Sequence, residues 1–472
     1  MKRAGLLLLS FYIGCAGFAQ KIQYSRQVVS TPRVDAMQLV TNVAGNHHLL
    51  TFRLGKNPKV FVFNKQLQLT AETEIEAKLK DNHDIRIIPF REYYFLQLSG
   101  SGTSNKKLLK VSADGETEDI TERFLKVIDS AGINRQATIQ LVNQNNSLCL
   151  VSMIYADAVK AVYAKILELN ADLNIIEMKE VSFPFHLGKE NLQQTTLTQG
   201  HFVVLKTIRD DESRHVLELS KINLTTGEVL FNTFTTATHL YSNPAFRYAE
   251  KDSSVFLYSL IREQPNSGRQ DRSVLVAKLN DSLQEITPLN LLKSQFRNNA
   301  RFNFLTVESE QPFWITLGNG FVNRVVSINS TPNLGSAYLA NRSITNGFYM
   351  GGGPQASQLP SLRLTVLNEQ LRPSSDSLVE SKDLFYDLQP SPIGQCTINR
   401  TAYLVLIQNF TANKRGLVMV NADDNGMLKT TPLPVYDRYD YNPSLLQAGN
   451  DYFILPYSHK NETGLLKITL QD

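Results

Sequence analysis

Short runs of apolar residues recur along the chain and are separated by polar breaks. Many runs come in pairs, at residues 49–54 and 59–63, 255–260 and 273–277, 403–407 and 416–420, and 452–455 and 464–468. Each run has the length of a β-strand and is either apolar throughout or alternates between apolar and polar residues, unlike the stripe of an amphipathic helix. The pattern predicts an all-β protein.

A short turn element follows these pairs. It joins an apolar residue, then Asn or Ser, two or three polar residues, and Leu, Gly or Pro. Its second position falls at Asn64, Ser112, Asn170, Asn223, Asn280, Asn329, Asn368 and Asn421, with a truncated copy at Thr469. The spacing is roughly 50 residues, as in repeat proteins. Because Asn and Ser hydrogen-bond to nearby backbone and Gly accepts positive φ, we expect each element to close a hairpin.

Proline marks a third feature of the repeat. Asn243-Pro244, Gln389-Pro390 and Asn442-Pro443 precede further apolar stretches, and we expect each to open a strand, where proline is tolerated. One unit then holds four short strands in about 50 residues, which is the content of a propeller blade.

On these features the chain resembles the β-propeller superfamily. No subfamily is indicated, since the single tryptophan, Trp314, precedes Ile315 and the Trp-Asp dipeptide of WD40 blades is missing. The resemblance implies a single β-propeller of eight or nine four-stranded blades. Nine follows from counting turns, and eight from treating residues 299–390 as an irregular insertion. Two separate β-sandwich domains are the alternative fold.

The two ends of the chain suggest how the ring closes. The last repeat stops after its third strand, whereas residues 22–29 form a strand that belongs to no repeat. Pairing of these segments would supply the missing fourth strand and remove an exposed sheet edge. We therefore expect the N-terminal strand to complete the last blade.

The N-terminus has the pattern of a secretory signal. Lys2 and Arg3 precede an apolar stretch at residues 4–13, and Gly17-Phe18-Ala19 matches a small-residue cleavage site. We assign residues 1–19 to a signal peptide and residues 20–472 to the β-propeller domain. The protein is then exported, to the periplasm, the cell surface or the medium.

A lipid anchor is the alternative to simple cleavage. Ile13-Gly14-Cys15 is similar to the end of a bacterial lipobox, in which the cysteine is lipidated. The apolar stretch is too short to span a bilayer, which takes about 20 residues, and no later stretch is long enough. We expect no transmembrane span.

Composition excludes several classes of protein. The chain has 472 residues, of which 42% are hydrophobic and 19% charged, and a net charge of +4. This balance is that of a globular protein and gives no footprint for nucleic acid. After cleavage only Cys149 and Cys396 remain, too few for a structural zinc site. They fall on distant blades, so we expect no disulfide between them.

Candidate binding residues cluster in the predicted loops between blades. Residues 436–441 form the densest group of aromatic and charged side chains, and tyrosine rings beside charged groups suit a glycan or peptide. Tyr and Asp also serve simply to pack and cap turns. The predicted ligand-binding residues are Tyr436, Asp437, Arg438, Tyr439, Tyr441, His239 and Tyr241.

Catalytic and metal motifs are scarce. His47 and His48 are adjacent, so on a strand they point to opposite faces and do not share one ion. The predicted inner strands, such as residues 136–141 and 193–197, carry almost no acid. We therefore predict a binding or scaffold protein that recognises a glycan, peptide or partner protein, with no cofactor, metal or catalytic residue assigned. The alternative is a propeller hydrolase or lyase acting on polysaccharide, which needs two positioned carboxylates.

Overall fold

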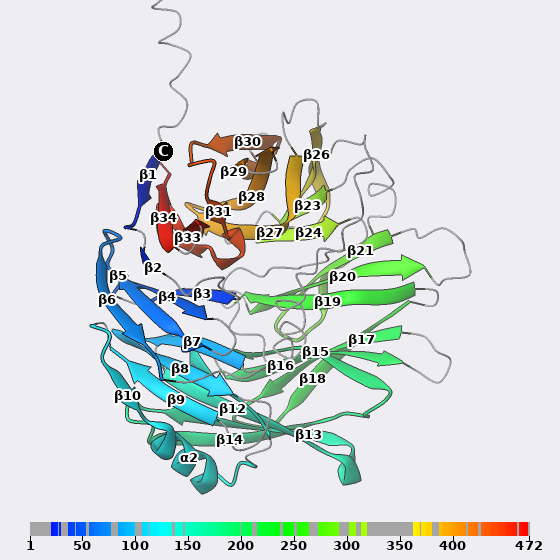
Figure 1. Cartoon of the computed structure of the whole chain (residues 1–472). Coiled ribbons are helices and arrows are strands. Elements are labelled where there is room, and N and C mark those ends of the chain that lie inside the picture. Colours follow the sequence, from blue (N-terminus) through cyan, green and yellow to red (C-terminus); the bar gives the residue numbers. More distant parts are fainter. Residues whose placement is uncertain are drawn as a thin grey trace, which may run out of the picture.

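The protein is built from separate β-sheets that follow one another along the chain (Figure 1). The structure is a computed structural model. It describes residues 20–472 apart from residues 27, 30–35, 43, 53–55, 77–83, 100–105, 113, 135–136, 145–146, 199, 210–214, 237–238, 250–252, 264–271, 292–301, 308–312, 319–361, 369, 380–386, 412–413, 423–425, 460–461 and 471–472. The predicted signal peptide and Cys15 lie outside the described residues.

Seven of the sheets in the described part have four strands, and we call them blades. The first two comprise β3 (Ala36–Thr41), β4 (His47–Phe52), β5 (Lys59–Phe63) and β6 (Leu69–Glu74), then β7 (Asp84–Phe90), β8 (Tyr93–Ser99), β9 (Lys106–Val111) and β10 (Thr117–Asp119). The next two comprise β11 (Thr138–Gln144), β12 (Ser147–Ala156), β13 (Ala161–Leu169) and β14 (Ile175–Pro184), then β15 (Glu190–Thr198), β16 (His201–Arg209), β17 (His215–Asn223) and β18 (Val229–Thr236).

The remaining three blades complete this series. They comprise β19 (His239–Ala249), β20 (Ser254–Glu263), β21 (Arg272–Leu279) and β22 (Glu285–Leu291), then β23 (Phe302–Val307), β24 (Phe313–Gly318), β25 (Leu362–Leu367) and β26 (Pro373–Val379), and finally β27 (Asp387–Ile398), β28 (Thr401–Thr411), β29 (Lys414–Ala422) and β30 (Leu428–Leu433). Strand order follows the chain in every blade except β23–β26, where β23 lies between β24 and β25 and runs parallel to β25.

An eighth sheet, which we call the closing sheet, has six strands. It contains β31 (Asp440–Tyr441), β32 (Gln447–Ala448), β33 (Tyr452–His459) and β34 (Glu462–Thr469), joined by β1 (Lys21–Tyr24) and β2 (Val28–Val29) from the other end of the chain. Both N-terminal strands pair antiparallel with β34, from Lys21 opposite Thr469 to Val29 opposite Glu462. The blue β1 therefore lies beside the red β34 in Figure 1.

The predicted β-propeller is confirmed, but the expected eight or nine four-stranded blades are wrong. The described residues form seven four-stranded blades and one six-stranded closing sheet. The count of nine fails because β23, β24, β25 and β26 form a single sheet, and because Thr469 pairs with β1. The turn predicted at Asn329 lies outside the described residues. The part of the chain that the structure describes does not form two separate β-sandwich domains.

Neighbouring sheets share their hydrophobic cores. In β5, Val60 and Val62 pack toward the β7–β10 blade, while Phe61 and Phe63 pack toward the closing sheet. None of these four side chains is exposed. Because both faces of an inner strand are covered, such strands read as wholly apolar runs, and this explains the pattern in the sequence.

Two short 3-10 helices, η1 (Asp157–Val159) and η3 (Pro443–Leu445), and one α-helix interrupt the described strands. The helix, α2 (Thr121–Ser130), follows β10. It buries Phe124, Val127 and Ile128 in the core between the β7–β10 and β11–β14 blades. The spacing of three and four residues puts these side chains on one face of the helix.

The predicted asparagine turns join the third and fourth strands. In the turn after β13, the Asn170 side-chain oxygen accepts hydrogen bonds from the backbone N–H groups of Asp172 and Asn174, both at 2.9 Å. Asn64 and Asn368 each hold their own turns with two such bonds. The mechanism expected from the sequence is therefore confirmed at these positions.

Leucine, not glycine, takes the positive φ in four of these turns. These leucines are Leu67, Leu173, Leu283 and Leu371, with φ between 55° and 64°. Each is at most 2% exposed. A left-handed non-glycine residue costs about 1–2 kcal/mol, and burying a leucine returns about 1.5–3 kcal/mol. Burial thus explains why these turns keep leucine.

The prolines lie within strands and do not open them. Pro244 is in the middle of β19, at a register shift between Ser242 and Ala245. Pro390 falls in a similar shift inside β27, between Leu388 and Ile393. Pro lacks the N–H that a regular ladder needs, and a bulge removes that requirement. Pro443 begins η3 instead.

The two cysteines form no disulfide, as expected from the sequence. Cys149 lies in β12 and Cys396 in β27. They are buried in different core clusters.

We predict that Asn170→Ala lowers the free energy of unfolding by about 1–2 kcal/mol, because two backbone donors lose their acceptor. Asn174→Ala is the matched control, since its exposed side chain lies in the same turn. Urea unfolding of the two variants measures the difference. Equal destabilisation by both would show that the Asn170 side chain does not hold the turn.

Candidate functional site

The tyrosine loop, residues 436–441, lies where the two ends of the chain meet. It connects β30 to the closing sheet and surrounds Tyr24 of β1. The Tyr24 ring lies 4.8 Å from the ring of Tyr436 and 5.8 Å from that of Tyr439, measured between centroids. Tyr439 in turn stacks on Tyr457 of β33 at 4.7 Å. The loop is therefore part of an aromatic cluster that includes the N-terminal strand.

Hydrogen bonds fix the same cluster. The Tyr441 hydroxyl donates to the Tyr436 carbonyl oxygen at 2.7 Å, and the Tyr436 N–H donates to the Tyr24 hydroxyl at 2.9 Å. The hydroxyls of Tyr24 and Tyr441 lie 3.1 Å apart. Because Tyr441 already donates its proton to Tyr436, Tyr24 is the donor in this last bond.

Burial keeps these hydroxyls protonated. It raises the pKa of Tyr24, Tyr441 and Tyr457 above the usual tyrosine value. Tyr457 also donates to the Ser25 carbonyl oxygen at 3.1 Å. All three phenols are therefore neutral hydrogen-bond donors at physiological pH.

Backbone contacts hold the rest of the loop. The Arg415 side chain of β29 forms an ion pair with Asp440. The backbone N–H of Arg415 donates to the Asp437 carbonyl oxygen at 2.8 Å. His459 Nδ1 lies 3.1 Å from the Arg438 carbonyl oxygen. Since a carbonyl only accepts, His459 carries its proton on Nδ1.

The predicted site residues of the tyrosine loop differ in the solvent exposure of their side chains. Tyr436 is 62% exposed and Arg438 is exposed, whereas Tyr441 is only 4% exposed. Tyr439 and Asp437 are partly buried. The structure thus brings the five loop residues together, but Tyr441 serves the closing sheet rather than a solvent-facing surface.

His239 and Tyr241 do not join this cluster. They lie in β19 rather than in a loop, so their predicted loop position is wrong. Tyr241 is 8% exposed, and its hydroxyl donates to the Phe234 carbonyl oxygen in the core between the β15–β18 and β19–β22 blades. The side chain of His239 is outside the described part of the structure.

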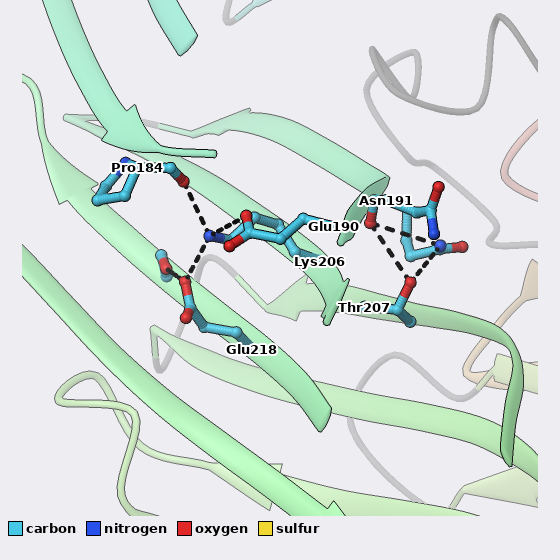
Figure 2. A network of polar contacts seen from close by, with 8 residues as sticks. Pro184, Glu190, Asn191, Lys206, Thr207 and Glu218 are labelled. Carbon is cyan, nitrogen blue, oxygen red and sulfur yellow. Dashed lines mark hydrogen bonds and ion pairs between the residues drawn. The ribbon is translucent and has the colours of Figure 1, made fainter. Parts of the chain in front are cut away.

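A buried ionic network was missed by the sequence analysis. Lys206 of β16 is 2% exposed, and its Nζ lies 2.9 Å from the Pro184 carbonyl oxygen (Figure 2). It also lies 3.0 Å from a carboxylate oxygen of Glu190 and 3.0 Å from one of Glu218. An ammonium group has three N–H donors, so these three acceptors account for all of them.

The network joins two blades. Pro184 ends β14, while the three charged residues come from β15, β16 and β17 (Figure 2). Beside it, the Gln193 side chain donates to the Thr207 hydroxyl at 2.9 Å. The inner strand predicted from Gln193 begins at Glu190 in the structure, three residues earlier. Glu190 is the only acidic residue of this strand, and its presence at the start of an inner strand could have indicated a buried ion pair.

His47 and His48 point to opposite faces of β4, as predicted. The rings of His48 and Tyr94, which belongs to the next blade, have their centroids 4.4 Å apart. On the other face, the positive charge of Lys467 in the closing sheet contributes to lowering the pKa of His47. Burial lowers the pKa of both histidines to about 4, so both are neutral at pH 7. They are buried residues of two different interfaces.

The described residues hold neither a metal cluster nor a membrane-spanning helix. They contain no group of three or more His, Cys, Asp and Glu side chains placed to hold a metal ion. Among the helices of the described part, none has the length and apolar character needed to cross a membrane.

Comparison with known proteins shows no family. No protein-family model matches the chain, and no curated protein is similar to it. Among solved structures, the WD40 domain of SCAP from fission yeast matches with a TM-score of 0.35 and 8% identity, over 96% of this chain and 98% of that chain.

Two enzymes are also similar at this low level. A mutant of the Synechocystis apocarotenoid oxygenase matches with a TM-score of 0.33 and 11% identity, over 56% of this chain. The match spans 61% of the oxygenase chain. A thermostable family-43 glycoside hydrolase matches with a TM-score of 0.27 and 10% identity, over 59% of this chain and 100% of that chain. Similarity at this level carries no information about activity.

We predict that Lys206→Met lowers the free energy of unfolding by about 3–5 kcal/mol, because it leaves buried carboxylates without their cation. Lys160→Met is the matched control, since Lys160 pairs with Asp157 at the surface and such pairs contribute little. Denaturant unfolding compares the two. A Lys206→Met variant as stable as the control would show that the network does not stabilise the interface.

Proposed function

We propose that the protein is an exported binding or scaffold propeller that recognises a glycan, a peptide or a partner protein through the tyrosine loop. Export rests on the signal-peptide pattern of residues 1–19. Release by cleavage after Ala19 is part of the proposal, and a lipid anchor at Cys15 is its alternative. The destination is then the periplasm, the cell surface or the medium.

The observation that carries the proposal is the exposed but immobilised ring of Tyr436. The side chain is 62% exposed, yet Tyr24 and Tyr439 contact its ring and hydrogen bonds hold its backbone on both sides. A fixed aromatic surface loses little conformational entropy on binding. Sugar rings and apolar side chains both stack on such a surface.

Charged groups next to the ring add polar contacts. Arg438 is exposed two residues after Tyr436, and Asp440 is held by Arg415. A guanidinium group recognises carboxylates and hydroxyl groups through several donors in one plane. This combination favours an acidic or hydroxyl-rich ligand.

The alternative, a hydrolase or lyase, is supported less well. Glu190 and Glu218 each lie 3.0 Å from Lys206 Nζ, so the two oxygens that contact it are at most about 6 Å apart, closer than the carboxylates of inverting glycosidases. Both are also bound to a buried cation. Among the described residues this pair therefore stabilises an interface and does not face a substrate.

We predict that Tyr436→Ala reduces retention on an array of glycans, peptides and surface proteins by about tenfold, because the stacking surface is lost. Tyr436→Phe is the matched control and keeps the ring. Tyr441 is left unchanged, since its replacement would disturb the closing sheet.

Two results would contradict the proposal. One is an array signal that Tyr436→Ala leaves unchanged. The other is an array on which the unmodified protein, with a normal melting transition, binds nothing.

A further inference from the structure

A cavity of about 280 Å³ lies between the β11–β14 and β15–β18 blades. Its lining includes Ile166, Leu197 and Leu224, which are apolar, together with the thiol of Cys149. Pockets for drug-sized ligands are typically about 300–1,000 Å³, so this one suits a single long side chain. It is separate from the tyrosine loop, which lies at the closing sheet (Figure 1).

The polar part of the cavity carries an excess of negative charge. Glu168 and Glu177 both line it, against the single ammonium group of Lys179. Lys179 pairs with Glu177 at 3.0 Å, while Glu168 accepts a hydrogen bond from the Ser147 hydroxyl at 2.7 Å. The ammonium group of Lys179 is thus paired with Glu177, whereas the contact given by Glu168 is to a neutral hydroxyl, and the lining keeps one carboxylate more than it has cations.

The negative charge of Glu168 also affects the thiol of Cys149 in the cavity. Burial, and next the charge of Glu168, raise the pKa of Cys149 to about 11. The opposing effect of Lys179 is smaller. Burial disfavours a charge of either sign, so only the effect of Glu168 indicates that a cation is favoured beside the thiol.

The β15–β18 blade carries exposed apolar side chains on the face that it turns toward the β11–β14 blade. In β18, Val229 pairs with Ile222, which packs in the core between these two blades. Phe231 pairs with Ser220 and lies on that same face of the sheet, since side chains two apart share a face. Val229 is 39% exposed and Phe231 66% exposed. Large apolar side chains in this position suit contact with a partner.

The outer strands add an open edge. Among the described strands, β14 and β18 each pair on one side only. Their free backbone groups allow an extended segment to align beside them. The cavity and the face that carries Val229 and Phe231 thus belong to the same interface between two blades.

We propose that this groove docks an extended segment of a partner protein and that the cavity accepts a Lys or Arg side chain from it. The alkyl stem of that side chain packs on Leu197 and Leu224, and its cationic end binds Glu168 and Glu177. Apolar residues next to it in the partner contact Phe231. The proposal goes beyond the ligand assigned to the tyrosine loop and does not depend on it.

The test uses the whole chain and three synthetic probes. These are the acetylated and amidated peptides Leu-Arg-Leu and Leu-Gln-Leu, and acetylarginine amide. Methyl NMR signals of Leu197 and Leu224 report occupancy during titration. We expect saturable shifts with Leu-Arg-Leu, no comparable shift with Leu-Gln-Leu, and weaker binding of acetylarginine amide, because it lacks the apolar flanks.

Variants localise the effect. Glu177→Gln, which changes an exposed side chain, and Glu168→Gln should each weaken Leu-Arg-Leu binding by about tenfold through loss of a charged partner. Phe231→Ala should weaken the tripeptide but not acetylarginine amide. Glu180→Gln, on the same strand as Glu177, and Tyr436→Ala are controls that should bind normally.

Four results would overturn the proposal. Three are the absence of saturable shifts with Leu-Arg-Leu, equal binding of the arginine and glutamine peptides, and normal binding by both glutamate variants. The fourth concerns the small probe. If acetylarginine amide binds as tightly as the tripeptide, the cavity is a site for small guanidinium compounds and the docking of a protein segment is refuted. Because Tyr436→Ala is a control here, failure of this proposal is distinct from failure of the tyrosine-loop assignment.

Discussion

The antiparallel pairing of β1 with β34 is the contact on which the remaining architecture depends. Each blade covers the inner faces of its neighbours, so the last sheet must meet the first for every core to be closed. The core between the closing sheet and the β3–β6 blade contains Val28 from the N-terminus, Ile454 and Leu465 from the C-terminus, and Phe61 between them in sequence. Tyr24 and Ser25 reinforce the pairing through hydrogen bonds that span more than 400 residues of chain.

The contacts between blades are either wholly apolar or partly polar, and the cavity proposed as a docking site lies at a partly polar interface. Most shared cores are apolar, as around Phe61. The interface between the β11–β14 and β15–β18 blades also has polar ends, with the Lys206 network at one and the cavity with Glu168 at the other. The closing sheet instead exposes an aromatic ring, Tyr436, above a fixed cluster. The two proposals therefore rest on different parts of the molecule, the tyrosine loop and the cavity beside Glu168.

The sequence predicted what depends on local rules. Asn170 and its counterparts identified the turns because the asparagine side chain acts on its own backbone, and apolar runs such as residues 59–63 identified strands covered on both faces. The sequence pattern did not predict the features that depend on contacts between residues distant in the chain. The parallel pairing of β23 with β25, the extra strand β2 and the ion pairs of Lys206 join residues far apart in sequence, and no local pattern encodes them. For the same reason no local pattern indicated that Tyr441 is buried and contacts Tyr24.

Removal of the N-terminal strands tests the central claim most directly. The chain lacking residues 20–31 is compared with the chain of residues 20–472 by urea unfolding, with and without a synthetic peptide of residues 20–31. Closure by β1 and β2 predicts a lower midpoint for the shortened chain and a partial return toward the original midpoint when the peptide is added. An unchanged midpoint, with no effect of the peptide, would contradict the claim that these strands close the propeller.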